Sequence, residues 1–179
     1  MTATSHTSSV ANSGTEQPIT RRSRGLRLVA PDGPTIAPRR GKVTTADYGR
    51  LVRELKHKYK IAIRKWRGHM SGIAYELTYR DGRIKRLIAA PRPRSPVSAA
   101  IFLHEVGHHA IGFRRYGSRC LEEHYVWQWT FREMEARGIA ITHRVMRHFR
   151  RSMYHYVKRS QQRREVVPAE LAHFGHWPG

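Results

Sequence analysis

The segment "LHEVGHHAIGF", Leu103–Phe113, places three histidines and one glutamate within six consecutive residues of an otherwise apolar stretch. In a helix, His104 and His108 would lie one turn apart and project their imidazoles from the same face, where both can bind one metal ion. Glu105 would lie about 100° further round the helix, within reach of a metal-bound water. A metal ion that activates water, beside a carboxylate that moves its proton, is the arrangement that hydrolyses peptide bonds.

A catalytic zinc site usually has three protein ligands and leaves a fourth position open, so a third ligand is expected. In the metzincin peptidases the motif continues to a glycine and a third histidine, but these positions hold Ile111 and Arg114 here. That class is therefore excluded. The following segment, "RCLEEHYVWQWTFREME", offers two carboxylates, those of Glu122 and Glu123.

We expect Glu123 to be the third ligand, because helical spacing places it within about 50° of the centre of an apolar face, whereas Glu122 lies about 150° away. That face consists of Cys120, Trp127, Phe131 and Met134. A buried glutamate on an aromatic face is costly unless a cation meets it. The competing interpretation is that His104 and His108 are ordinary core histidines and that Glu123 pairs with an arginine.

Other polar residues nearby leave alternatives open. His124 and Cys120 are weaker ligand candidates on this helix, and His109 points away from the ligand face, which favours a supporting or surface position. No group that stabilises the charge developing on a substrate carbonyl can be assigned, although Tyr116, Tyr125 and His109 are within reach along the chain.

A helix and a hairpin are predicted ahead of this motif. The helix begins at Thr44 or Thr45, and its apolar residues recur at helical spacing. These are Tyr48, Leu51, Val52, Leu55 and Tyr59. Alternating residues then flank Asp81-Gly82, a strong signal for a two-residue turn, which would pair Tyr79 with Ile84 and Tyr75 with Ile88.

The motif itself is predicted to lie on a helix that begins with Ser95 as N-cap and Pro96 in the first turn and ends at Gly112 or Gly117. Gly107 inside this helix indicates a close backbone approach. Two further helices are expected, about residues 118–137 and 142–159. The fold class is therefore α+β, a single domain in which a small antiparallel sheet packs with the His-Glu-x-x-His helix and three to four further helices.

Composition bounds the remaining possibilities. With 34 Lys and Arg against 13 Asp and Glu, the net charge of +21 favours association with polyanions. The single cysteine excludes an intramolecular disulfide. No apolar run is long enough for a membrane span or a signal peptide, so a cytoplasmic location is expected. Residues 1–42 are predicted to form a disordered basic tail, and residues 43–179 the domain.

The segments "LIAAPRPRSPVSAAIFLHEVGHHAIG" and "CLEEHYVWQWTFREMEARGI" resemble the ImmA/IrrE-type metallopeptidases, in which one helix carries His-Glu-x-Gly-His and the next supplies a glutamate. The family's Ala-Asn pair after that glutamate is Val126-Trp127 here. The resemblance covers roughly residues 45–140 and implies a zincin-like fold. It also implies a zinc ion held by His104, His108 and a downstream glutamate, Glu105 as general base, and a repressor-type transcription factor of a mobile element or stress circuit as substrate.

The helix near the C-terminus suggests a second class of function. Residues 137–164 hold nine Lys and Arg and no Asp or Glu. The apolar face of this helix is predicted to consist of Val145, Phe149, Met153 and Tyr156. A stripe of positive charge lies opposite that face and matches nucleic-acid phosphates. The stripe consists of Arg144, Arg147, Arg151, His155 and Lys158. The alternative function is therefore a basic nucleic-acid-binding protein whose motif holds a structural metal ion or none.

Overall fold

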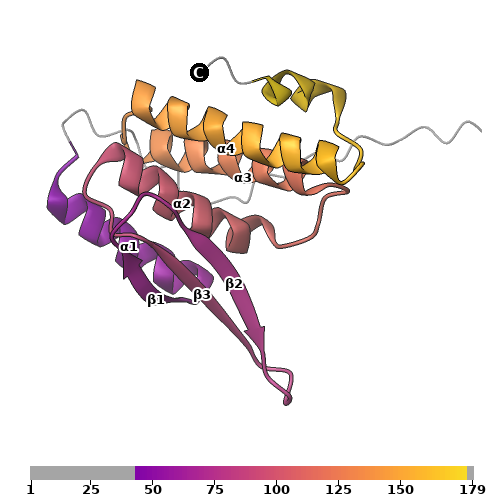
Figure 1. The fold of residues 1–179 in the computed structure, drawn as a ribbon. Coiled ribbons are helices and arrows are strands. Elements are labelled where there is room, and N and C mark those ends of the chain that lie inside the picture. Colours follow the sequence, from indigo (N-terminus) through magenta and orange to yellow (C-terminus); the bar gives the residue numbers. More distant parts are fainter. Residues whose placement is uncertain (1–42, 177–179) are drawn as a thin grey trace, which may run out of the picture. The chain divides into compact units, whose positions relative to one another are not determined.

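The computed structural model describes residues 43–176, which form four α-helices, three strands and a short 3-10 helix (Figure 1). In chain order these are α1 Thr45–Tyr59, β1 Ile61–Arg67, β2 Ile73–Thr78, β3 Ile84–Pro91, α2 Pro96–Ile111, α3 Arg119–Ala136, α4 His143–Gln162 and η1 Ala169–Gly175. The predicted α+β class is confirmed. The predicted basic tail lies outside the described residues.

The sheet has the order β1-β3-β2, and it is mixed. The expected antiparallel hairpin is present as β2 and β3, but β1 joins the other side of β3 in a parallel arrangement, so the sheet is not wholly antiparallel. Strand β1 was not predicted. Its alternation is broken by an irregularity between Ile63 and Lys65, and its partner is not adjacent along the chain.

The predicted hairpin register is wrong by one residue. Tyr75 pairs with Leu87, not with Ile88, and Thr78 pairs with Ile84. The turn contains a third residue because Gly82 adopts a φ of 80°, a left-handed conformation that closes a three-residue hairpin loop. The N–H of Tyr79 donates to the carbonyl of Arg83 (2.9 Å), which fixes this longer loop.

Side-chain caps define the helix that carries the motif. The Ser95 hydroxyl accepts a hydrogen bond from the Ser98 N–H (3.3 Å), Pro96 occupies the first turn, and Gly112 ends the helix with a φ of 84°. Helix α1 begins in the same way, with Thr44 as its N-cap. These predicted boundaries are confirmed.

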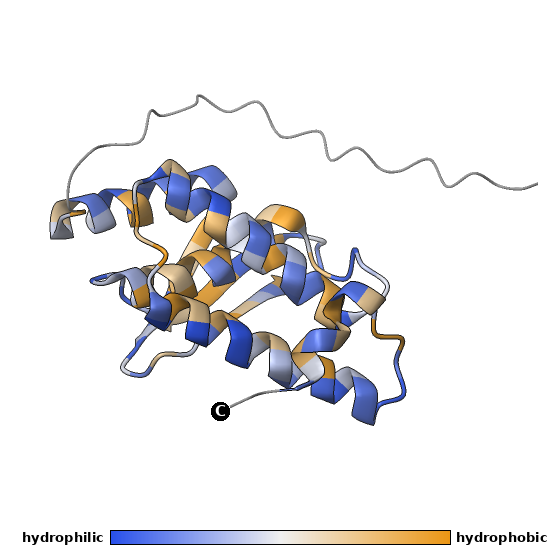
Figure 2. Ribbon diagram, turned by 90° about the horizontal axis from the view of Figure 1, so that it is seen from above, coloured by the Kyte–Doolittle hydropathy of each residue, from blue (hydrophilic) through white to orange (hydrophobic). Residues whose placement is uncertain are grey.

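Helix α2 is the centre of the core, because β3 packs on one side of it and α3 and α4 pack on the other. Figure 2 shows hydrophobic residues on the strands and on parts of each helix, with hydrophilic residues between them. The predicted close approach at Gly107 is confirmed, since a Cβ there would lie 2.9 Å from Cγ1 of Val126 and 3.0 Å from Cε3 of Trp129. The missing side chain therefore lets α3 lie directly against α2.

The inner face of α4 contains the predicted residues Val145, Phe149 and Met153, which are buried, and η1 then packs back on this helix.

Across residues 43–176, no helix combines the length and the apolar character that crossing a lipid bilayer requires.

Candidate metal centre and its cavity

His104 and His108 lie on the buried side of α2, and the carboxylate of Glu123 reaches them from α3. Nε2 of His104 lies 3.0 Å from Oε2 of Glu123, and Nε2 of His108 lies 3.5 Å from Oε1 of the same carboxylate. All three residues are buried, with exposed fractions of 7%, 3% and 0%. Two imidazoles and one carboxylate oxygen therefore converge from two neighbouring helices.

This group can hold a metal ion. Among the described residues, one ligand atom from each of His104, His108 and Glu123 lies within 4.8 Å of the others. Neutral imidazole and carboxylate are suitable ligands for a first-row divalent cation, and three protein ligands leave a position open. Glu123, predicted as the third ligand, is thus placed where that prediction requires.

The protonation states that the surroundings favour are those of ligands. Burial lowers the pKa of His104, against the opposing effects of the hydrogen bond and charge of Glu123, so the imidazole is neutral near pH 7. For Glu123, burial acts to raise the pKa, but the hydrogen bond from His104 and the positive charge of Arg119 outweigh it and lower the pKa. The carboxylate is therefore ionised and the ring is not.

Glu122, the alternative third ligand, has a different set of neighbours. Its Oε2 accepts a hydrogen bond from the backbone N–H of Arg114 (2.6 Å), and its Oε1 pairs with Arg119 and lies 3.6 Å from Nδ1 of His108. Glu122 is buried, although the helical spacing placed it far from the apolar face. It faces the ring nitrogen of His108 that points away from Glu123, which is where a supporting carboxylate orients a metal-binding histidine.

Arg119 connects the two glutamates. Its Nη2 lies 2.6 Å from Oε1 of Glu123, and Nη1 pairs with Glu122. The guanidinium also lies over the ring of Tyr156, 5.7 Å from its centroid. Part of the competing interpretation is therefore present, because Glu123 does pair with an arginine while also facing both histidines.

Glu105 lies beside the ligand group, on the wall of an open cavity. The residue is buried, with an exposed fraction of 6%. Burial, followed by the negative charge of Glu123, raises its pKa to about 8, against the opposing charges of Arg119 and Arg67. Gly72, just before β2, lies directly over this side chain. A cation bound at Glu123 would offset the charge that raises this pKa and would favour the ionised form.

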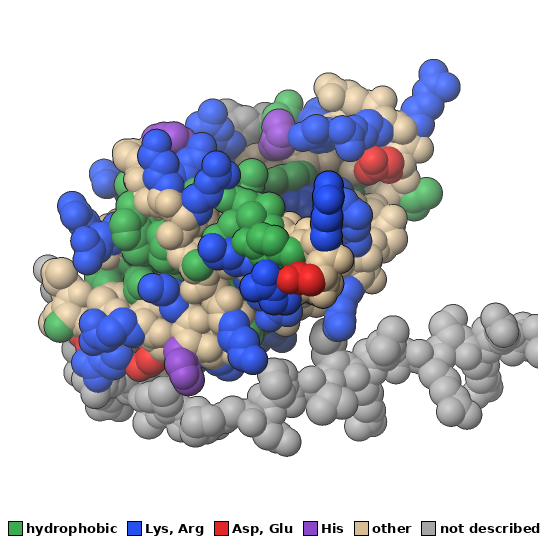
Figure 3. All heavy atoms as spheres, turned by 90° about the horizontal axis from the view of Figure 1, so that it is seen from below, with side chains coloured by type: hydrophobic (Ala, Val, Ile, Leu, Met, Phe, Trp, Pro, Cys, Tyr) green, Lys and Arg blue, Asp and Glu red, His purple; other side chains and the backbone are tan. Residues whose placement is uncertain are grey.

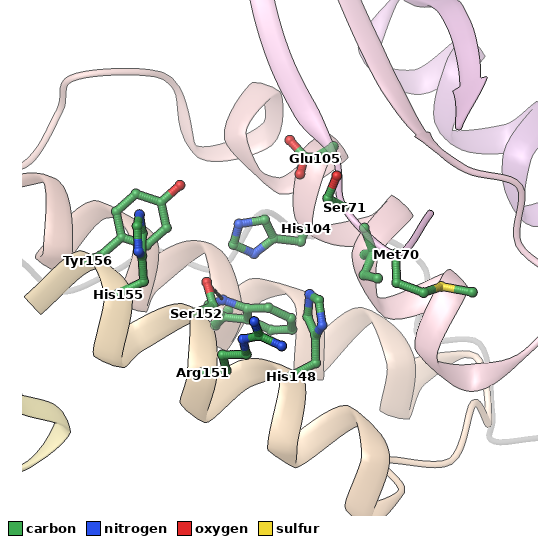
Figure 4. A pocket seen from close by; sticks show the side chains of 12 residues that line it. Met70, Ser71, His104, Glu105, His148, Arg151, Ser152, His155 and Tyr156 are labelled. Carbon is green, nitrogen blue, oxygen red and sulfur yellow. Dashed lines mark hydrogen bonds between the residues drawn. The ribbon is translucent and has the colours of Figure 1, made fainter. Parts of the chain in front are cut away.

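The cavity of about 490 Å³ is walled by α2, α3, α4 and the loop before β2 (Figure 4). The loop and α2 provide Met70, Ser71, Gly72, Ile101, His104 and Glu105; α3 and α4 provide Trp127, His148, Arg151, Ser152, His155 and Tyr156. Figure 4 shows the α4 side chains on the opposite side of the cavity from Glu105. The indole N–H of Trp127 donates to the Ser152 hydroxyl (3.2 Å), which joins α3 to α4 at the floor of this site.

The contribution of α4 was missed by sequence reasoning. Tyr156 was assigned to the apolar face of the helix, and Arg151 and His155 to a nucleic-acid stripe. The signal that could have found the wall is the recurrence of His148, Ser152 and His155 at helical spacing on one face. Only the packing of α4 against α2 shows that this face is directed at the motif.

Several residues near the motif in the sequence lie outside the ligand group. His109 is buried rather than at the surface, and its Nε2–H donates to the carbonyl of Leu87 (3.2 Å), which joins α2 to β3. Tyr116 and Tyr125 stack on each other with centroids 4.5 Å apart and do not line the cavity. His124 lies 2.7 Å from the Gln128 amide.

Cys120, the other weak ligand candidate, is a buried free thiol 3.3 Å from the Ser118 hydroxyl. It does not belong to the ligand group found among residues 43–176.

Comparison of the chain with models of protein families, with curated proteins and with solved structures finds no match.

Proposed function

We propose that the chain is a zinc-dependent endopeptidase of the ImmA/IrrE type, with His104, His108 and Glu123 as zinc ligands and Glu105 as general base. The observation that carries the proposal is the position of Glu105 next to the converging ligand atoms, on the wall of a cavity large enough for a peptide segment. A structural metal site is normally closed by four protein ligands, whereas this group offers three beside a cavity.

A zinc ion bound by the three ligands would supply a water of lowered pKa and would polarise the substrate carbonyl. Glu105 removes a proton from the attacking water and delivers it to the leaving amine, which requires a carboxylate that is held in place and shielded from bulk water. Burial of Glu105 beneath Gly72 provides both conditions.

Tyr156 is the residue that we infer to stabilise the substrate carbonyl. Its hydroxyl group lies in the cavity with Glu105 and His104. Burial, followed by the charge of Glu123, raises the pKa of Tyr156 to about 12, so the hydroxyl keeps its proton and can donate a hydrogen bond. Tyr156 therefore takes the role for which Tyr116, Tyr125 and His109 were considered from the sequence.

The test compares two substitutions in the full chain after loading with zinc. Glu105→Gln should retain one zinc ion per chain but lose at least about 100-fold in hydrolysis of a pool of fluorogenic peptides, because only the proton acceptor is removed. His104→Ala should lose both zinc and hydrolysis. Undiminished hydrolysis by Glu105→Gln would exclude the proposed mechanism.

The proposed substrate is a protein, and a DNA-bound repressor is the class that the family resemblance implies. The basic surface fits a substrate that is found on DNA. Exposed arginines of α4 include Arg144, Arg147 and Arg150, and Figure 3 shows that the opposite side of the molecule also carries many Lys and Arg and few Asp and Glu. Polyanions are attracted to such a surface without sequence specificity.

The same basic surface supports the alternative function, nucleic-acid binding without catalysis. The two functions differ in what Glu105→Gln changes. Retention on DNA should be unaffected by this substitution in either case, whereas hydrolysis should disappear only if the chain is a peptidase. A chain that binds zinc and DNA but cleaves no protein or peptide would favour the alternative.

A further inference from the structure

Helix α4 places a guanidinium group in the same cavity as the proposed general base. Arg151 lines the cavity opposite His104 and Glu105, with His148 and His155 one helical turn away on either side (Figure 4). Among the residues that line this cavity, Glu105 is the sole carboxylate. The α4 wall therefore presents positive charge to whatever enters.

Arg151 has no ion pair within the part of the chain that the structure describes. Some arginines in that part pair with carboxylates, such as Arg86 with Glu76 and Arg137 with Glu54 and Glu133. Within the same described residues the arginines of α4 do not, and among them Arg151 is the one that lines the cavity. Helix α4 itself contains no acidic residue that could meet Arg151. Its charge is thus left for a group from outside the chain.

The remaining surfaces of the cavity are suited to a peptide. Ile101 and Trp127 are buried and apolar, and Met70 is 53% exposed at the rim. Apolar walls with a few polar groups are typical of pockets that take a side chain or a small ligand. A nucleic-acid duplex is too wide to enter a cavity of about 490 Å³, and the exposed Arg144 and Arg147 do not line it.

We propose that the α4 wall of the cavity binds an acidic side chain of the substrate, close to the scissile bond, and that Arg151 is the specificity-determining residue. The inference deepens the proposed function and rests on it for the position of the scissile bond. An Asp or Glu side chain pairs with the guanidinium while the substrate backbone lies beside Glu105. Substrates with Lys at that position meet the like charge of the Arg151 guanidinium and are disfavoured.

The first experiment measures binding and does not depend on hydrolysis. The full chain is titrated with the blocked tripeptides acetyl-Ala-Glu-Ala-amide and acetyl-Ala-Gln-Ala-amide, and nitrogen-15 NMR follows the Nε–H signals of the arginines. The Glu peptide should shift the Arg151 signal and bind about 5-fold more tightly than the Gln peptide, the upper range for a partly exposed ion pair. Arg151→Gln should abolish this difference, and Arg147→Gln, one turn earlier on α4 and outside the cavity, should preserve it.

The second experiment uses zinc-loaded protein and quenched peptides that differ only in carrying Glu, Gln or Lys beside the cleaved bond. The wild-type chain should prefer Glu, and Arg151→Glu should reverse the preference towards Lys. Equal binding of the two tripeptides, or discrimination that survives Arg151→Gln, would overturn the inference. So would a short DNA duplex that shifts the Arg151 signal when the Glu peptide does not.

The two proposals can fail separately. If peptides are cleaved with no preference for acidic residues, the specificity inference is wrong and the peptidase remains. If the Glu peptide binds at Arg151 but no peptide is cleaved by the zinc-loaded chain, the acidic-ligand site is supported and the proposed catalysis is wrong.

Discussion

Gly72 lies so close to Glu105 that a Cβ atom at residue 72 would be 2.3 Å from a carboxylate oxygen and 2.4 Å from Cγ of the glutamate. The glycine stands immediately before β2, at the point where the loop crosses the buried side chain. Both distances are far below van der Waals contact, so any larger residue must displace Glu105. The position of Glu105, the proposed base, therefore depends on residue 72 in the loop before β2 being a glycine.

Gly72→Ala should therefore impair catalysis more than folding. We expect about a 100-fold fall in kcat for peptide hydrolysis, because a displacement of about 1 Å of a catalytic group has effects of that size. Zinc content and the unfolding temperature should change little, since the ligands lie on α2 and α3. Gly68→Ala, at a loop position with open space around the added methyl group, is the matched control.

Zinc should stabilise the protein through the three ligands. With free zinc at about 1,000 times its dissociation constant, the gain in unfolding free energy is about 4 kcal/mol, and a chelator should remove it. His104→Ala should abolish the zinc-dependent rise in unfolding temperature. His124→Gln changes a histidine that neighbours Glu123 in sequence but lies outside the ligand group, so it should retain the rise. Loss of the rise in His124→Gln alone would place the metal elsewhere.

The two adjacent glutamates should differ in their effect on zinc affinity. Glu123→Gln removes a ligand and should nearly abolish binding. Glu122→Gln should weaken binding only about 10–100-fold, the range for carboxylates that orient a ligand histidine, because Glu122 faces Nδ1 of His108 and not the common centre. Competition titration with a chromophoric chelator measures both. A larger loss in Glu122→Gln than in Glu123→Gln would reverse the assignment.

The sequence predicted the local features of this site well. Ser95, Pro96 and Gly112 act through neighbours within one helical turn, so the boundaries of α2 could be inferred from the residue types alone. Glu123 was predicted as the third ligand because a helical wheel separates it from Glu122, and it does belong to the group that could hold a metal ion. The hairpin was recognised from Asp81-Gly82, but the turn closes with one more residue than that pair suggests.

Features that depend on distant pairing could not be predicted in this way. Strand β1 is defined by parallel pairing with β3, about 25 residues later in the chain, and an irregularity hides its alternation. Tyr156 is indistinguishable from a core residue until α4 is placed against α2. Glu122 is buried because Arg114 and Arg119 satisfy its oxygens, a compensation that a hydrophobic pattern does not contain.

Acid should destabilise the fold through His148. Burial lowers the pKa of this histidine, and the nearby Arg151 lowers it further. His104 of α2 lies close enough to His148 for the two rings to interact electrostatically. The unfolded chain therefore takes up a proton at higher pH than the folded chain, so stability is complete above about pH 6.5 and falls as the pH decreases through the folded pKa. Urea unfolding at about pH 7.5 and about pH 5.5 measures the loss. It should be smaller in His148→Gln, and an equal loss in that variant would contradict the assignment.

The contact between α2 and α3 at Gly107 gives a prediction in which two effects oppose each other. Alanine is favoured over glycine inside a helix by about 1 kcal/mol, but the added methyl group would lie 2.9 Å from Val126 and 3.0 Å from Trp129. Overpacking of this kind costs about 1–3 kcal/mol, so Gly107→Ala should lower the unfolding free energy by up to about 2 kcal/mol. At Gly49 in α1 the nearest atom is the Arg53 guanidinium at an ordinary 3.6 Å. Gly49→Ala should therefore stabilise the protein. Urea unfolding of the two variants separates the effect of helix propensity from the effect of packing. A gain in stability at both positions would contradict the prediction, because it would show that α3 can move away from α2 without cost.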